Sequence, residues 1–155
     1  MEELLEAMEH DFEGYDMIYH MVHDKSPKYG NDDDYADKIM QDIFELYRTT
    51  ITGRPNMRGG EYRIDMLPTT CHVYFGDVIL ATANGRKAHK PVSEGISPEK
   101  SADTHGPTAV IRSCAKMDHL ATGGTLLNQK FTPDVVAGEE GLNNMASLIR
   151  SYFAM

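Results

Sequence analysis

The sequence contains no tryptophan, only two cysteines and no apolar run approaching the roughly 20 residues that cross a bilayer. The cysteines form no Cys-x-x-Cys pattern and cannot build a disulfide framework, which is typical of a reducing cytoplasm. Basic residues are also scarce, because 15 Lys and Arg stand against 24 Asp and Glu, a net charge of −9. We therefore expect a cytoplasmic protein that binds neither nucleic acid nor a membrane.

The apolar residues follow helical spacing in several stretches of this 155-residue chain. An acidic amphipathic stripe over 4–15 predicts a first helix, and Asp residues before Tyr35 favour the cap of a second helix over 35–50. Pro107 suits the first turn of a third helix, which carries Val110, Cys114 and Met117 on one face. A last helix is predicted over 139–153.

Two further stretches predict β-strands. LPTTCHVYF (67–75) is rich in β-branched and aromatic residues, and TLLNQKF (125–131) ends before a proline. Between them, 77–106 is an unusually long connection rich in glycine and proline, which is typical of a functional or a disordered loop. The pattern predicts an α/β fold with about four helices and two strands, too few strands to close a sheet.

No residue pattern by itself identifies a reaction. If 67–75 is a strand, Cys71 and His72 leave opposite faces and cannot form a dyad. His105 and His119 have acidic neighbours but no metal-ligand spacing, and the aspartates 32–34 suit a helix cap better than a calcium loop. The sequence therefore predicts no metal site and no bound cofactor. Polar residues within the predicted strands would line a pocket if those strands border a cavity. They are Thr69, Thr70, Asn128 and Gln129.

Several stretches, taken in order, resemble the glycyl radical enzymes of the pyruvate formate-lyase, glycerol dehydratase and trans-4-hydroxyproline dehydratase type. The similarity covers nearly the whole chain, and its specificity comes from the order of the pieces. They are PKYGNDDD (27–34), LPTTCHV (67–73), NGR (84–86), PVSEGISP (91–98), AD (102–103), HGPTAV (105–110) and TGGTLLNQKF (122–131).

The resemblance implies that 1–155 is part of a ten-stranded α/β barrel, in a C-terminal region of a much longer chain. A helical segment would occupy 1–52, and barrel strands, the long loop and helices would occupy 63–155. The loop would then wrap the outside of the barrel.

The family's chemistry needs a thiyl cysteine in a Cys-x-Glu-type loop and a backbone glycine radical in a motif like Arg-Val-x-Gly-Tyr. Neither motif occurs in this sequence, so no catalytic residue transfers to it. The resemblance does imply that LPTTCHV runs along the substrate pocket. Strand alternation would turn either Thr69 and Cys71, or Thr70 and His72, toward the substrate, and we favour the Thr70 hydroxyl.

The expected function is that of a fragment of a lyase or dehydratase, inactive alone, which cleaves C–O, C–N or C–C bonds of a small polar substrate after hydrogen abstraction by a thiyl radical. The intact enzyme would carry a glycyl radical installed by a radical-SAM activating enzyme and would form a homodimer. The apolar faces of the present chain predict that, when isolated, it associates or is only marginally stable. One alternative is a non-catalytic spare part that docks onto a split enzyme, and another is an unrelated acidic binding domain.

Overall fold

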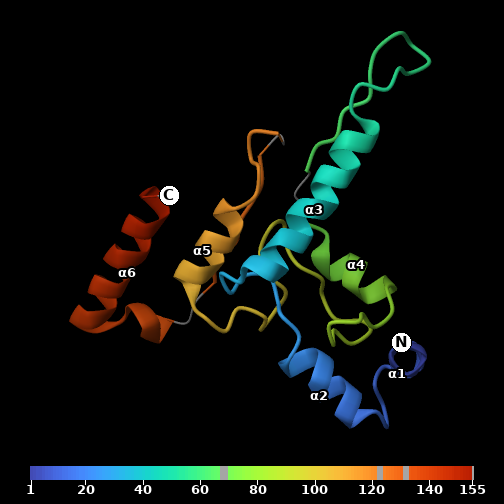
Figure 1. The fold of residues 1–155 in the computed structure, drawn as a ribbon. Helices are drawn as coiled ribbons and strands as arrows, with labels where there is room; N and C mark the ends of the chain where they lie inside the picture. Colours follow the sequence, from blue (N-terminus) through green and yellow to red (C-terminus); the bar gives the residue numbers. More distant parts are fainter. Residues whose placement is uncertain (67–69, 122–123, 131–132, 155) are drawn as a thin grey trace.

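The computed structural model describes residues 1–66, 70–121, 124–130 and 133–154 (Figure 1). Within them the backbone forms six α-helices and one 3₁₀ helix, and its only β-pairings are isolated bridges. The predicted count of about four helices and two strands is thus wrong for the described chain. The helices are α1 (Glu2–Glu9), α2 (Asp16–Asp24), α3 (Asp34–Ile51), α4 (His72–Val78), α5 (Pro107–Ala115), η1 (Pro133–Val136) and α6 (Gly138–Phe153).

The apolar stripe over 4–15 is divided between two helices. Asp11 and Phe12 have positive φ angles of 51° and 64°, which end the helical path after α1. The Phe12 ring is only 2% exposed and packs with Ala7 and Ala81 in a small core. Burial of this ring accompanies the break, and α2 begins directly after it, a helix that the sequence pattern did not predict.

The second predicted helix is confirmed as α3. The side chain of Asp33 accepts hydrogen bonds from the backbone N–H groups of Tyr35 at 2.9 Å and Ala36 at 3.2 Å. The acidic run before this helix therefore acts as an N-cap, as its composition predicts. The loop 53–62 follows α3 and extends beyond the C-terminal end of that helix (Figure 1).

The predicted strand over 67–75 is wrong where the structure describes it, because α4 occupies 72–78. The N–H of Phe75 donates to the carbonyl of Cys71 at 2.9 Å, which closes the first helical turn. Gly76 lies against the backbone of 90–91 so closely that a Cβ atom would come within 2.2 Å of the Lys90 carbonyl oxygen. Tertiary packing thus overrides the strand preference of the β-branched and aromatic residues.

The long connection is confirmed, because 79–106 contains neither helix nor strand beyond a bridge between Gly95 and Leu127. That bridge is the only β-pairing that the described part of 125–131 makes, so the second predicted strand is also wrong there. Phe131 lies outside the described residues. Within the described ranges the chain therefore has helices but no strand. Residues 72–75 of the first predicted strand are helical, and residues 125–130 of the second are irregular apart from the bridge.

The two C-terminal helices are confirmed, but α5 ends at Ala115, so Met117 lies beyond the helix that was expected to carry it. Pro107 occupies the first turn of α5, where its missing N–H costs no hydrogen bond, and α6 covers the predicted range. The two helices pack against each other, and η1 packs against α6 (Figure 1).

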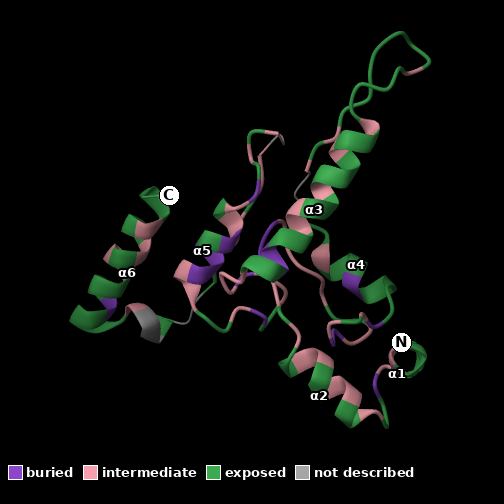
Figure 2. Cartoon of the chain, in the orientation of Figure 1, coloured by how far each residue is buried: buried purple, intermediate pink, exposed green. Residues whose placement is uncertain are grey.

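Buried residues are few and scattered (Figure 2). Much of α3, α4 and α6 presents large apolar side chains to solvent. Examples are Ile43, Leu46, Tyr74, Val78, Leu142 and Phe153, exposed by 53%, 65%, 67%, 60%, 68% and 78%. Among the described residues no helix combines the length and the apolar character that a membrane span requires.

Candidate functional site: the segment before α4 and its supporting network

Thr70 and Cys71 directly precede α4, and both are exposed. Cys71 is the N-cap residue of this helix, and the carbonyl of Thr70 lies 3.2 Å from Nδ1 of His72. Thr69, the third predicted substrate-binding residue, lies outside the described residues. Because Thr70 and Cys71 are not in a strand, the alternation that separated inward from outward side chains does not apply to them.

A cavity of about 740 Å³ borders this segment at His72. Its charged side chains carry both signs, and Lys130 Nζ lies 3.4 Å from Glu94 Oε2. Such a surface can hold a small polar molecule through both carboxylate and ammonium groups. The principal polar lining residues are His72, Glu94, Ser97, Asp103, Asn128 and Gln129.

One wall of the cavity is built by two segments that meet across Gly95. The N–H of Ile96 donates to the carbonyl of Leu126 at 3.0 Å. The Ser97 hydroxyl donates to the Asn128 carbonyl at 3.2 Å and accepts from the Asn128 N–H at 2.9 Å. A Cβ atom at Gly95 would lie 2.3 Å from the Leu126 carbonyl oxygen, so the approach requires glycine.

The amides that the sequence singled out lie on this wall. Asn128 and Gln129 both line the cavity, although from an irregular segment rather than a strand. Oε1 of Gln129 is buried and has no hydrogen-bond partner within the described parts of the chain. Since a buried acceptor is costly to leave unpaired, this oxygen is suited to receive a donor from a bound molecule.

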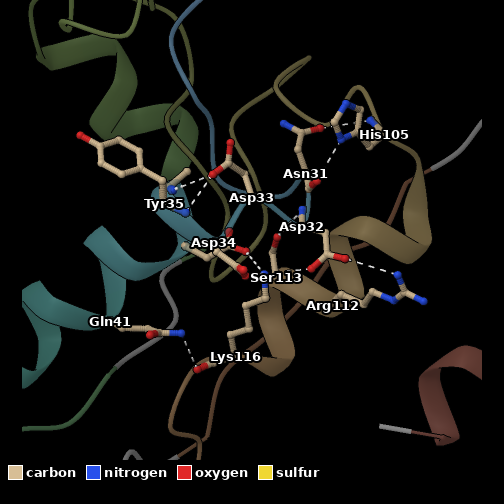
Figure 3. A network of polar contacts seen from close by, with 12 residues as sticks. Asn31, Asp32, Asp33, Asp34, Tyr35, Gln41, His105, Arg112, Ser113 and Lys116 are labelled. Carbon is tan, nitrogen blue, oxygen red and sulfur yellow. Dashed lines mark hydrogen bonds and ion pairs between the residues drawn. The ribbon is translucent and has the colours of Figure 1, made fainter.

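A polar network joins the end of the long loop, 102–105, to α5 and to the segment that leads into α3 (Figure 3). Asn31 bridges the loop to the N-terminal part of the chain: its Nδ2 donates to the Ala102 carbonyl at 2.7 Å, and its Oδ1 accepts from the N–H of Thr104 at 2.8 Å and of His105 at 3.1 Å. The Ser113 hydroxyl on α5 accepts from the N–H of Asp32 at 2.9 Å.

Lys116, just after α5, is the centre of the charged part of this network. Its Nζ lies 2.9 Å from Asp32, 2.8 Å from Asp34 and 2.8 Å from Asp37. Burial by itself would lower the pKa of this ammonium, but hydrogen bonds to Asp34, Asp37 and Asp32 raise it above its ordinary value. The hydrogen bond from Lys116, aided by Arg112, lowers the pKa of Asp32 against an opposing effect of burial.

The second cysteine is held in a different environment. Burial raises the pKa of the Cys114 thiol, with the nearby Tyr29 hydroxyl acting in the opposite direction. That hydroxyl is itself buried, does not meet hydrogen-bond geometry with any described residue, and has its pKa raised chiefly by burial. Cys114 is therefore a protonated packing residue rather than a reactive thiolate.

The histidines considered as ligands have structural partners. Nδ1 of His105 lies 2.9 Å from the Asn31 carbonyl, and Nε2 of His119 lies 2.9 Å from the Cys114 carbonyl. Across the described ranges, no group of three His, Cys, Asp or Glu side chains is placed to hold a metal ion.

Two family models match the chain, one after the other. The "Pyruvate formate lyase-like" model matches residues 1–76, and the "Glycine radical" model matches residues 92–155. The second match does not supply the radical glycine itself, because no motif like Arg-Val-x-Gly-Tyr occurs in the sequence.

Curated relatives align along the whole chain. It is 66% identical over 155 residues to trans-4-hydroxy-L-proline dehydratase of Clostridioides difficile, covering 100% of this chain and 20% of the relative. It is 39% identical to (2S)-3-sulfopropanediol dehydratase of Klebsiella oxytoca and 40% identical to isethionate sulfite-lyase of Nitratidesulfovibrio vulgaris, in each case over 98% of this chain and 19% of the relative. The chain thus spans about a fifth of these proteins.

Solved structures give the same result. The hydroxyproline dehydratase of Clostridioides difficile with trans-4-hydroxy-L-proline bound matches with a TM-score of 0.84 and 65% identity, over 99% of this chain and 19% of that chain. The B12-independent glycerol dehydratase of Clostridium butyricum matches with a TM-score of 0.80 and 39% identity, over 99% and 20%. The backbone arrangement of this chain is therefore shared with part of enzymes that are about five times longer.

Proposed function

Because this chain belongs to the glycyl radical enzymes, we propose that it forms part of the C-terminal region of a dehydratase that removes water from a hydroxylated cyclic amino acid. The observation that carries this proposal is the 66% identity to trans-4-hydroxy-L-proline dehydratase, against 39% and 40% for relatives with acyclic sulfonate substrates. The gap favours an amino-acid substrate over a sulfonate.

The chain's own part in this function is to shape a wall rather than to carry the radical. Neither Cys71 nor Cys114 lies in a Cys-x-Glu loop, and the radical glycine has no counterpart here. In the intact enzyme the glycyl radical would supply the unpaired electron that hydrogen abstraction from the substrate requires. An unpaired electron survives only in an enclosed site, so the isolated chain would be inactive.

The cavity beside α4 has the chemistry that a zwitterionic substrate needs. Glu94 and Asp103 can attract an ammonium group, while Lys100 and Lys130 can attract a carboxylate. Thr70 is exposed and lies two residues before His72, which lines this cavity. We assign its hydroxyl to substrate contact. The activating radical-SAM enzyme and a homodimeric state belong to the same proposal, by family resemblance.

The test is a chimera in which this chain replaces the aligned fifth of the Clostridioides difficile dehydratase. After activation, we expect turnover of trans-4-hydroxy-L-proline and none of isethionate. A matched chimera carrying the aligned segment of the isethionate sulfite-lyase controls for the exchange itself. If the chimera carries the radical and does not turn over hydroxyproline, the proposed substrate class is wrong.

A variant of the same chimera tests Thr70. Thr70→Val removes the hydroxyl while keeping the branched shape, and loss of one hydrogen bond to substrate should lower kcat/KM about tenfold. Thr50→Val, on the exposed face of α3, is the control and should leave kcat/KM unchanged. Equal activity of both variants would remove Thr70 from the substrate site.

A further inference from the structure

A second cavity, of about 240 Å³, lies between α2 and the loop 84–102 and is strongly basic. Five cations and a single carboxylate line it, in a chain whose overall charge is −9. This concentration of positive charge contrasts with the negative charge of the chain as a whole and calls for an explanation. The five cations are Lys28, Arg86, Lys87, Lys90 and Lys100.

Arg86 is the buried cation of this cavity, with 7% of its surface exposed. Its guanidinium donates to the carbonyls of Lys87 at 3.0 Å and Lys90 at 2.7 Å, and also to that of Leu80. Its Nε has no partner, and no carboxylate pairs with this side chain within the described residues. Because neutral carbonyls cannot offset a charge, a buried guanidinium remains without a counter-ion.

Lys28 lines the same cavity and, like Arg86, donates only to neutral acceptors among the described residues. Its ammonium donates to the carbonyl of Asn84 at 2.7 Å, to the Ser26 hydroxyl at 3.2 Å and to the Val22 carbonyl at 3.3 Å. All three are neutral acceptors. Burial lowers the pKa of Lys28, and the more distant charges of Glu99 and Asp24 offset this only in part.

The remaining charges do not neutralise the cavity. Lys87 Nζ lies over the Tyr19 ring, 5.4 Å from its centroid, and Lys90 and Lys100 are exposed at the rim. The single carboxylate, Glu99, accepts a hydrogen bond from the Asn84 amide. Among the described lysines elsewhere, Lys38 and Lys116 pair with aspartates, whereas no ion pair joins a carboxylate to any of the five cations of this cavity.

We propose that this cavity is an anion site for a small multiply charged oxyanion of the phosphate class. A volume of 240 Å³ holds on the order of eight waters at ~30 Å³ each, which suits a tetrahedral oxyanion with part of its hydration shell. Guanidinium and ammonium groups are the side chains that bind such oxyanions. The site adjoins the cavity at His72 that we assign to the substrate, and the two share Pro91, Glu99, Lys100 and Ser101 as lining residues.

The test titrates inorganic phosphate into the full chain at low ionic strength by isothermal calorimetry. We expect saturable one-to-one binding that weakens with added sodium chloride. The double variant Lys90→Gln, Lys100→Gln removes two rim charges without touching the buried scaffold, and should weaken binding about tenfold. The matched control, Lys38→Gln with Arg150→Gln, removes two charges elsewhere and should change affinity less than twofold.

The chimeric enzyme provides a second measurement in which the rest of the barrel supports the fold. Equilibrium dialysis of phosphate against the chimera and its two double variants should repeat the same ranking. The proposal is overturned if neither protein binds phosphate saturably, or if the control pair weakens binding as much as the rim pair does. Equal weakening by the control pair would show that phosphate is attracted by the net charge of the protein rather than bound in this cavity.

Discussion

At the scale of single residues, Lys116 has the strongest structural role in the network. Asp37 is fully buried, and one of its carboxylate oxygens meets Lys116 Nζ at 2.8 Å while the other has no partner among the described residues. A buried carboxylate is stabilised only while its cation is present. The junction between α3 and α5 therefore depends on this ammonium.

We expect Lys116→Met to open that junction. Removing one partner of a buried pair costs about 3 kcal/mol, because the remaining charge stays desolvated. Hydrogen–deuterium exchange of peptides covering 31–41 and 106–117 should accelerate roughly 100-fold, the ratio that this free energy implies.

The control for this variant is Lys38→Met on the exposed face of α3. Lys38 also pairs with an aspartate, Asp42, at 2.6 Å, but both side chains are mostly exposed. Such surface pairs contribute under about 1 kcal/mol, so exchange should change only a few-fold. Equal effects of the two variants would show that burial of Asp37 does not govern the junction.

The pH dependence of stability follows from Asp32. Its pKa is lowered in the folded chain, so its stabilising contribution is complete above the unfolded value of about 3.9 and is lost as pH falls through the folded value. Lys116, whose pKa is raised, loses its contribution only as pH rises above about 10.4.

We therefore expect the thermal unfolding midpoint, followed by circular dichroism, to fall steeply below about pH 4. In Asp32→Asn this acid loss should be shallower, because the titrating group is gone while Asp34 and Asp37 still hold Lys116. Identical acid profiles of the two proteins would exclude Asp32 as a source of the pH dependence.

At the scale of elements, local patterns predicted the helices that carry their own signals. α3 has an aspartate cap and α6 a long amphipathic stripe, so both were predicted nearly to their ends, whereas the proline at the start of α5 predicted only where that helix begins. The break at Phe12 and the helix α4 depend on packing against 81 and 90–91, distant positions that no local pattern reports.

The sites were less predictable than the helices for the same reason. Asn31 meets residues more than 70 positions later, and Lys116 meets Asp37 79 positions earlier, so neither network is visible as a motif. The polarity of Asn128 and Gln129 predicted a pocket only on the condition that a strand carrying them borders a cavity, and they line one from an irregular segment. The role proposed for Thr70 comes from resemblance alone, and its predicted strand setting is wrong.

Gly76→Ala tests the packing that turns the predicted strand into α4. The new methyl would lie 2.2 Å from the Lys90 carbonyl oxygen and 2.6 Å from Pro91 Cα, both backbone atoms that cannot rotate away. Overpacking of this kind costs about 1–3 kcal/mol. We expect exchange of peptides covering 72–80 and 90–93 to accelerate about tenfold or more.

Gly60→Ala is the matched control, since a Cβ there would meet only the Asn56 side-chain amide, at 3.1 Å. Neither glycine has a positive φ angle, so alanine strains the backbone at neither position. The comparison therefore tests only the space available for the new methyl group. Unchanged exchange around α4 in Gly76→Ala would mean that the helix does not depend on this close approach.

At the scale of the whole molecule, the chain exposes too much surface for an independent domain of its size. Its accessible area is 10993 Å², whereas a compact 17.4 kDa monomer has about 7,900 Å². The excess coincides with the exposed apolar side chains of α3, α4 and α6 (Figure 2). Together with the span of a fifth of its relatives, this supports the proposal that these faces are interior surfaces of a larger glycyl radical enzyme.

Electron paramagnetic resonance of the chimera after treatment with the radical-SAM activating enzyme tests whether those faces close a barrel. We expect a glycyl doublet of yield comparable to that of the intact dehydratase, because the chain restores the enclosure that protects the radical. The isolated chain, treated in the same way, should give no doublet. A chimera that remains soluble yet shows no doublet, while the intact dehydratase does, would contradict the assignment of this chain to the barrel wall.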